Sequence, residues 1–461
     1  MKEPFIRTAK ETVQDEIKQI VLQSLSKLQK EMKADVAGFG SKVKVNYPAY
    51  WDRVKDNWQD TFSEIPIDVR VEVQIKRTGA LCKRRGSVMP NIPSMKQDEI
   101  STIQALLTVT STVYAVGIVS LPRTITEQTQ TPDVWQGLLL ASLFGVGVVF
   151  INVKLCRRFP GKTFYELNSV IAGKFISLFI NIAFMVYCVM ICSLVSRMMA
   201  EFLKALALER TPVSMILLPF LLLIGYLTSG GLHAMVRLVE LFFPLTFIVY
   251  LLLIILNINH FDIDNLLPVF HQGWGPILKS LKVVPFSTLG FESMLILTNF
   301  MVNPQKAWKA GGIGYSIAMA LYVMMVTMVV GCMSVEEVSR LQWPVVSFAQ
   351  QIEFPGSFLE RFEIFFIILW TIKIFMTASN YYFYLVAGIS QLTQKWNGYI
   401  FYLPLIIIFA VSIYPQNFIQ IDNFDTVTGY FGIIICAAVP LVLLLISMIF
   451  CIRGNLDGKR S

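Results

Sequence analysis

Ten apolar segments, each of about 20 residues, follow one another from Ile100 almost to the end of the chain. A helix of this length crosses the hydrocarbon core of a bilayer, which is about 30 Å thick. The hydrophobic content of 55% and the mean hydropathy of +0.59 exclude an ordinary soluble domain. The sequence therefore predicts an all-α polytopic membrane protein with ten transmembrane helices. The predicted spans are 100–122, 134–155, 175–203, 213–229, 236–257, 277–301, 308–332, 360–386, 399–414 and 428–451.

The charged residues of the loops predict the topology. Of the net charge of +8, residues 1–96 contribute 18 Lys and Arg against 12 Asp and Glu, or +6. Further basic residues follow the second span and close the chain, whereas acidic residues such as Asp262 and Glu336 dominate the opposite loops. The positive-inside rule then places both termini in the cytoplasm. The basic residues suit a membrane surface, and nothing in their pattern indicates nucleic acid.

The first 80 residues form a separate unit that precedes the membrane spans. A capping box at Thr8–Glu11 opens a helix, and Pro48 opens a second one. Residues 67–76 alternate apolar and polar side chains, as in a half-buried strand. Because two helices and one unpaired strand cannot form a sheet, this is a small α+β fragment of a larger domain. The expected organisation is fragment 1–80, basic linker 81–99, membrane domain 100–453 and cytoplasmic tail 454–461.

Two of the spans contain residues that interrupt a helix. Gly117 and Pro122 lie in the first span, and Pro285 and Gly290 lie in the sixth. Interruptions at corresponding positions indicate two five-helix repeats of inverted topology, with a ligand site between the broken helices. Unwound segments direct amides toward an anionic group and carbonyls toward a cationic one, which suits a zwitterion such as an amino acid. The candidate ligand-binding residues of the two interruptions are Gly117, Ile118, Val119, Ser120, Ser287, Thr288, Gly290, Phe291 and Glu292.

Charged side chains within spans are rare and are candidates for function. Glu292 lies beside the interruption of the sixth span and is the strongest candidate; its alternative role is structural pairing with a neighbouring helix. Lys373 in the eighth span is a possible charge partner of Glu292, or an ammonium in place of a bound cation. The three histidines are scattered over loops, so we expect no metal site, and no motif indicates an enzyme or a cofactor.

The membrane domain resembles the GerAB-type spore germination permeases, the B subunits of nutrient germinant receptors in the amino acid/polyamine/organocation superfamily. The resemblance rests on Met95-Lys-Gln-Asp-Glu-Ile-Ser-Thr-Ile-Gln-Ala, on Gly-Ile-Val-Ser-Leu-Pro-Arg at the end of the first span, and on Phe-Pro-Gly-Lys-Thr-Phe-Tyr-Glu after the second. It implies a LeuT-like fold and a site flanked by the third and eighth spans. Their polar-tipped residues Tyr187, Thr377 and Tyr381 are therefore further candidates for ligand binding, with helix packing as the alternative.

The fragment 1–80 resembles the C-terminal end of the GerAC-type subunit of the same receptors. The resemblance is carried by Lys30-Glu-Met-Lys-Ala-Asp-Val-Ala-Gly-Phe-Gly, by Tyr47-Pro-Ala-Tyr-Trp followed by Trp58, and by Lys76-Arg-Thr-Gly. Such subunits lie outside the membrane, whereas the charges here place the N-terminus inside. The hypothesis is that residues 1–88 are a fusion or gene remnant and that Met95 resembles the native start.

These resemblances imply a receptor subunit in the spore inner membrane or the bacterial cell membrane. It would bind a small nutrient, an amino acid or similar solute, and signal germination together with the A and C subunits. The alternatives are an active proton-coupled amino acid permease, a passive channel for water or ions, and a non-functional fusion product.

Overall fold

The computed structural model describes residues 99–115, 117–352, 362–393 and 398–452, together with parts of residues 14–70. The chain divides into two compact units, Met1–Val88 and Met89–Ser461. The capping box at 8–11 and the linker 81–98 lie outside the described residues, as does most of the predicted strand 67–76.

The described part of the first unit is a group of short helices around an aromatic cluster. Helices α2 (Phe39–Asn46), α3 (Pro48–Val54) and α4 (Trp58–Glu64) follow one another, and Pro48 stands at the first turn of α3, where its missing N–H is not needed. The Phe39 and Phe62 rings stack with centroids 5.8 Å apart. Trp58 donates a 3.0 Å hydrogen bond from Nε1 to Asp35. The second predicted helix of the fragment is therefore present.

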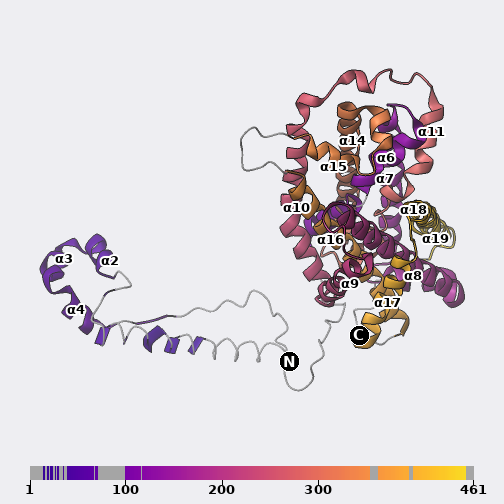
Figure 1. Ribbon diagram of the computed structural model, residues 1–461. Coiled ribbons are helices and arrows are strands. Elements are labelled where there is room, and N and C mark those ends of the chain that lie inside the picture. The colour runs from indigo at the N-terminus through magenta and orange to yellow at the C-terminus, as the bar shows by residue number, and fades with distance from the viewer. Residues whose placement is uncertain are drawn as a thin grey trace. The chain divides into compact units, whose positions relative to one another are not determined.

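Helices make up the second unit throughout its described residues (Figure 1). They are α5 (Thr102–Val113), α6 (Gly117–Thr129), α7 (Val134–Arg158), α8 (Phe164–Leu206), α9 (Val213–Ser229), α10 (Gly231–Leu256), α11 (Trp274–Val283), α12 (Pro285–Thr288), α13 (Ser293–Leu297), α14 (Ala307–Arg340), α15 (Pro344–Gln350), α16 (Phe362–Thr393), α17 (Gly398–Ile413), α18 (Phe418–Ile433) and α19 (Val439–Ile449).

These helices account for the ten predicted spans. Six segments of the described chain are long and apolar enough to cross a membrane, two bent helix pairs qualify as broken spans, and α9 and α17 are shorter apolar helices, which together make ten. The bent pairs are α5–α6, with an angle of 45°, and α11 with α12–α13, with an angle of 73°. These pairs are the first and the sixth span, the two for which the sequence predicts interruptions.

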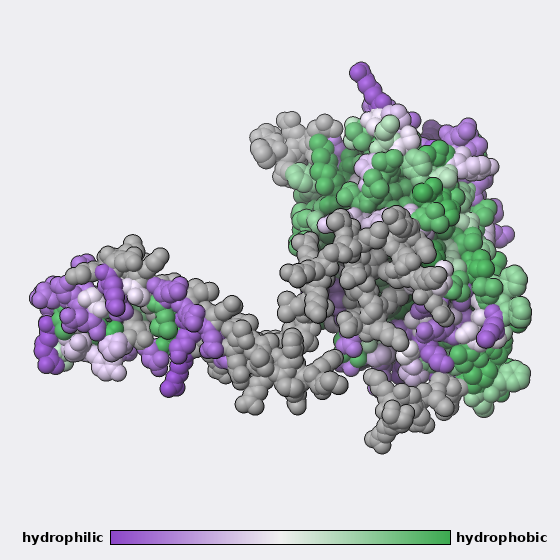
Figure 2. All heavy atoms as spheres, turned by 90° about the horizontal axis from the view of Figure 1, so that it is seen from below, coloured by the Kyte–Doolittle hydropathy of each residue, from purple (hydrophilic) through white to green (hydrophobic). Residues whose placement is uncertain are grey.

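The broken spans lie between two groups of long helices. The seventh span, α14, packs against α5, α6 and α7, and the eighth span, α16, packs against α8, α9 and α10. The core of the unit is a single apolar cluster that includes the residues at both interruptions. Figure 2 shows hydrophobic side chains over much of the visible surface of this unit. Large apolar side chains that remain exposed, such as Phe175, Tyr226 and Ile406, are expected on a face that contacts lipid.

A short main-chain bridge joins the start of the first span to the end of the sixth. Ile100 donates its N–H to the Phe300 carbonyl at 2.7 Å, and Val302 donates to the Ile100 carbonyl at 3.0 Å. Next to the bridge, Ser101 and Gln104 form a capping box at the start of α5. The two broken spans are thus tied together at one end by backbone hydrogen bonds.

Candidate functional site

The first interruption separates α5, which ends at Val113, from α6, which begins at Gly117. The carbonyl groups released there find donors on the two long helices that flank them. Tyr322 of α14 donates from Oη to the Val113 carbonyl at 2.8 Å, and Trp370 of α16 donates from Nε1 to the Ala115 carbonyl at 3.0 Å. Interrupted backbone inside a membrane requires such partners, because lipid supplies none. The interruption is therefore built into the packing of the seventh and eighth spans.

The second interruption lies between α12 and α13. Gly290 has a φ of 118°, a conformation that L side chains rarely adopt, so the glycine is required by the backbone here. Its N–H donates to Oε2 of Glu292 at 2.8 Å. The Thr288 carbonyl, at the end of α12, accepts a 2.9 Å bond from Tyr315 of α14. One face of α14 thus supports both interruptions through Tyr315 and Tyr322.

The two interruptions touch each other through their glycines. A Cβ atom on Gly117 would lie 2.7 Å from Oγ of Ser287 and 2.8 Å from Oη of Tyr322. A Cβ atom on Gly290 would lie 2.5 Å from Cγ2 of Val113. No side chain larger than hydrogen fits at these positions without movement of the neighbours. The closest approach of the two broken spans therefore depends on Gly117 and Gly290.

A small cavity lies where the interruptions meet. Its volume is about 20 Å³, which is room for about one water molecule. Four candidates from the sequence line it, namely Gly117, Ser287, Thr377 and Tyr381, so the structure brings residues of the first, sixth and eighth spans together. The full lining is Thr112, Val113, Gly117, Ile191, Val195, Phe286, Ser287, Leu289, Tyr322, Thr377 and Tyr381.

Glu292 is fully buried and holds three elements together. Its Oε1 accepts hydrogen bonds from Oη of Tyr187 on α8 at 2.5 Å and from Oη of Tyr381 on α16 at 2.6 Å. With the amide of Gly290 on Oε2, both oxygens of the Glu292 carboxyl group accept hydrogen bonds. Glu292 is not among the residues that line the cavity, whereas Tyr381 is. Tyr381 therefore connects the cavity to Glu292.

In the described part of the chain, no ion pair joins Lys373 to Glu292, its possible charge partner in the sequence. Its side chain is buried, and its Nζ lies 4.5 Å from the ring centroid of Tyr114 and 5.5 Å from that of Phe243. On α16, Lys373 is eight residues before Tyr381, or about 12 Å along the axis. The helix therefore carries the ammonium away from the carboxylate that Tyr381 contacts. Lys373 instead faces the first interruption, next to Tyr114.

The remaining candidates from the two interruptions are packed against the protein and do not line the cavity. Ile118 and Val119 are buried in the first turn of α6, and Phe291 is fully buried. Ser120 is half-buried, and its carbonyl accepts a 2.9 Å bond from Thr124. None of these four residues lines the cavity, and neither does Thr288, whose carbonyl is held by Tyr315.

Sequence reasoning missed the contribution of the seventh and tenth spans. Tyr315 and Tyr322 are seven residues apart on α14, a spacing that indicates one helix face but not what that face contacts. In the tenth span, a Cβ on Gly432 would lie 2.7 Å from the Tyr187 ring. A π-helical turn, Ile434–Ala438, follows it, and the Cys436 carbonyl accepts a bond from Asn152 at 3.2 Å. No sequence pattern signals this turn.

Comparisons with known proteins agree with this architecture. Residues 99–421 match the family described as spore germination protein, and residues 1–79 match the family described as spore germination B3/GerAC like, C-terminal. The solved structure of MhsT in complex with L-phenylalanine aligns with a TM-score of 0.57 at 12% identity, covering 77% of this chain and 99% of that one. This likeness shows the fold, which is LeuT-like.

Curated relatives match the two parts of the chain separately. Spore germination protein YndE of Bacillus subtilis is 33% identical over 349 residues, which is 76% of this chain and 96% of YndE. Spore germination protein YndF of the same organism is 46% identical over 77 residues, which is 17% of this chain and 19% of YndF. The chain is therefore a multi-pass integral membrane protein that belongs to the spore germination protein family, preceded by a GerAC-like C-terminal segment.

Proposed function

We propose that the chain is the B subunit of a spore germinant receptor and that it binds a small zwitterionic nutrient, such as an amino acid, between its two broken spans. The observation that carries the proposal is the direct contact of the two interruptions around a cavity with polar lining groups. Neither interruption is needed to cross a membrane, and both are supported by side chains of neighbouring helices. Such an arrangement is expected where backbone groups meet a ligand.

The polar groups on each side of the cavity suit the two ends of a zwitterion. Helix α6 begins at Gly117, so its first N–H groups and the positive end of its dipole are directed toward an anionic group. The hydroxyl of Ser287 lies next to Gly117 and adds a further donor. On the other side of the cavity, the Val113 carbonyl at the end of α5 and the hydroxyl oxygen of Tyr381, whose proton is donated to Glu292, supply acceptors for a cationic group. In this proposal Glu292 is a positioning residue that orients Tyr381.

Signalling follows from the size of the cavity. A volume of about 20 Å³ holds a water molecule but no amino acid, so a ligand must separate the two interruptions when it binds. The contacts of Gly117 with Ser287 and of Gly290 with Val113 would then open. A ligand shifts the balance between the closed and the open state by no more than its difference in affinity for them. In this proposal, the shift toward the open state is the change that partner subunits detect.

The comparisons support this assignment in three ways. MhsT, which has the same fold, was solved with L-phenylalanine bound. The relative YndE is a spore germination protein. The segment similar to YndF suggests that the natural partners include a GerAC-type subunit, with the A subunit as the other partner. We place the protein in the spore inner membrane or the bacterial cell membrane, with both termini in the cytoplasm.

The test uses spores whose own B subunit is replaced by this chain, exposed to single L-amino acids. A nutrient that triggers release of spore contents should lose its effect in the variant Ser287→Ala and keep it in Ser169→Ala, an exposed serine outside the cavity. Binding of the same labelled amino acid to the purified chain should change in parallel. An unchanged response and unchanged binding in Ser287→Ala would refute the site.

A second candidate function is a proton-coupled permease, which the buried carboxylate of Glu292 favours. Carboxylates inside membrane proteins are recurrent parts of proton relays. In vesicles with an imposed proton gradient, a permease concentrates the labelled amino acid, whereas a receptor binds it without accumulation. Accumulation that requires Glu292 would replace the receptor proposal by the permease.

A further inference from the structure

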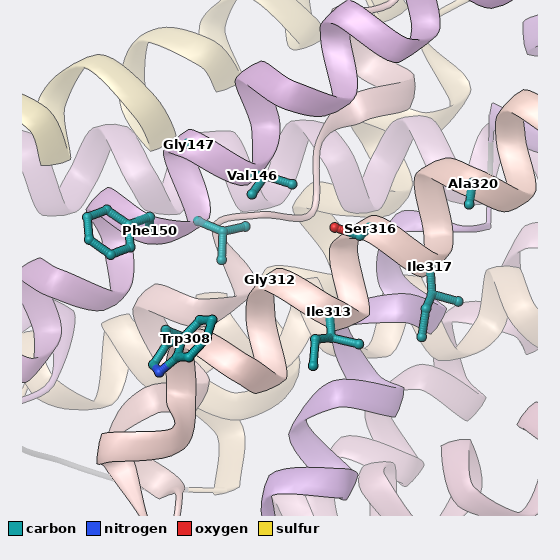
Figure 3. A pocket seen from close by; sticks show the side chains of 10 residues that line it. Val146, Gly147, Phe150, Trp308, Gly312, Ile313, Ser316, Ile317 and Ala320 are labelled. Carbon is teal, nitrogen blue, oxygen red and sulfur yellow. The ribbon is translucent and has the colours of Figure 1, made fainter.

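An apolar groove lies on the outside of the membrane unit, away from the cavity between the interruptions. It has a volume of about 750 Å³, within the range of roughly 300–1,000 Å³ found for ligand sites. Helices α7 and α14 form its two walls (Figure 3). Beyond its chain neighbours and the backbone of its own helix, a Cβ on Gly147 or Gly312 would meet no atom within 4 Å. Both glycines belong to the lining of the groove and leave open space there.

One end of the groove carries two aromatic rings, each with an ammonium group beside it. Phe150 and Trp308 lie together at this end, and Ile317 and Ala320 lie at the other (Figure 3). Nζ of Lys154 is 5.9 Å from the Phe150 ring centroid, and Nζ of Lys309 is 5.7 Å from that of Trp308.

The charges at this end are available to an anion. Both lysines are exposed, and neither forms an ion pair with a carboxylate in the described part of the chain. This is also the end at which α7 finishes, with Arg157, and at which α14 begins, just after Lys306. The groove thus has an apolar body and a basic mouth with an aromatic rim.

The length of the groove matches one leaflet of a bilayer. From Trp308 to Ala320, α14 advances twelve residues, or about 18 Å. One leaflet contributes about half of the 30 Å hydrocarbon thickness. A chain lying in the groove would therefore run from the level of the headgroups to near the middle of the bilayer.

We propose that this groove binds an anionic phospholipid, with an acyl chain along α7 and α14 and the phosphate between Lys154 and Lys309. Basic pockets between transmembrane helices at the headgroup level are suited to such lipids, and tryptophan prefers the same depth. Gly312, Ser316 and Ala320 form a stripe of small residues that a transmembrane helix of a partner also fits. Helix packing needs no pair of unpaired ammonium groups at one end, so the observations favour the lipid.

The test measures quenching of Trp308 fluorescence by brominated lipids. The full chain is reconstituted into phosphatidylcholine bilayers that contain either brominated phosphatidylglycerol or brominated phosphatidylcholine at equal mole fractions. Because the chain has 8 tryptophans, the signal of Trp308 is obtained as the difference from a Trp308→Phe variant. We expect brominated phosphatidylglycerol to reach half of its maximal quenching at a lower mole fraction than brominated phosphatidylcholine. The expected difference in mole fraction is about fivefold for each lysine.

The variants test separately the lysines at the mouth of the groove and the apolar body of the groove. Lys154→Gln with Lys309→Gln should abolish the preference, whereas Lys174→Gln with Lys279→Gln, which removes two exposed lysines elsewhere, should keep it. Gly312→Leu fills open space and should reduce quenching by both lipids. Equal quenching by the two lipids in the unaltered protein overturns the proposal. An absence of quenching by both lipids also overturns it, because it would show that protein covers the groove. The third contrary result is a Gly312→Leu variant that is quenched as strongly as the unaltered protein.

Discussion

Tyr381 donates a 2.6 Å hydrogen bond to Oε1 of Glu292 while its side chain lines the cavity between the two broken spans. The residue therefore has one contact with a buried carboxyl group and one with the place where a ligand is proposed to bind. A ligand that displaces Tyr381 must also disturb Glu292, and through it Tyr187 of α8 and the amide of Gly290.

Replacing Glu292 by glutamine should weaken the folded state and abolish the nutrient response. The amide keeps the shape but offers one acceptor oxygen where three donors converge, so at least one buried donor loses its partner. Each such loss costs about 1–3 kcal/mol of unfolding free energy. Thermal unfolding of the purified chain and spore germination measure the two effects. Glu336→Gln, in an exposed pair with Arg340, should change stability by less than about 1 kcal/mol.

Replacing Gly117 by alanine should push the two interruptions apart. The added methyl group would lie 2.7 Å from Oγ of Ser287, and overpacking of this kind costs about 1–3 kcal/mol. Gly312→Ala, also in a helix but facing open space, should be neutral or stabilising. The double variant Gly117→Ala with Ser287→Gly should recover part of the stability, because the close contact with Oη of Tyr322 at 2.8 Å remains. If the double variant is no more stable than Gly117→Ala alone, the contact between the interruptions is not the cause.

Replacing Lys373 by methionine should raise the midpoint of thermal unfolding while it reduces the nutrient response. Methionine keeps most of the volume and removes a buried ammonium whose neighbours are the Tyr114 and Phe243 rings. A buried cation–π contact contributes about 2 kcal/mol to stability. Removing a charge from water costs several kcal/mol, so the balance favours methionine. Lys373→Arg should retain the contact with Tyr114 and part of the response. A fall in the midpoint for Lys373→Met would contradict this reasoning.

Starting the chain at Met95 should leave the membrane unit folded and responsive. The bridge of Ile100 with Phe300 and Val302, and the capping box of Ser101, lie wholly within this unit and are kept. The thermal unfolding midpoint and the germination response of the shortened chain are compared with those of the full chain. Loss of response at a normal level of expression would show that residues 1–94 take part in signalling and are no remnant.

The sequence predicted the positions of the interruptions but not the contacts that hold them. Gly117, Pro285 and Gly290 are visible because glycine and proline disturb a helix wherever they occur. The partners of Glu292 depend on how helices far apart in the sequence face one another. For that reason the sequence offered Lys373 as a possible partner of Glu292, whereas the observed partners are two tyrosines and the Gly290 amide.

The contacts of Tyr322 and Trp370 could not be predicted from the sequence either. In an apolar helix such residues have the pattern of ordinary packing, and only the folded chain shows that they donate to the Val113 and Ala115 carbonyls. The tenth span was expected to be a plain helix, and its π-helical turn beside Asn152 has no sequence signature.

The bridge between Ile100 and residues 300–302 has a mechanical consequence. Two main-chain hydrogen bonds join the beginning of the first broken helix to the end of the second, so these two segments must shift together or break the bond pair. If the interruptions separate around a ligand as proposed, the joined ends form the pivot, and the opposite ends, α6 and α11, move the furthest. A force applied to the chain just before Ile100 would reach both broken helices at once.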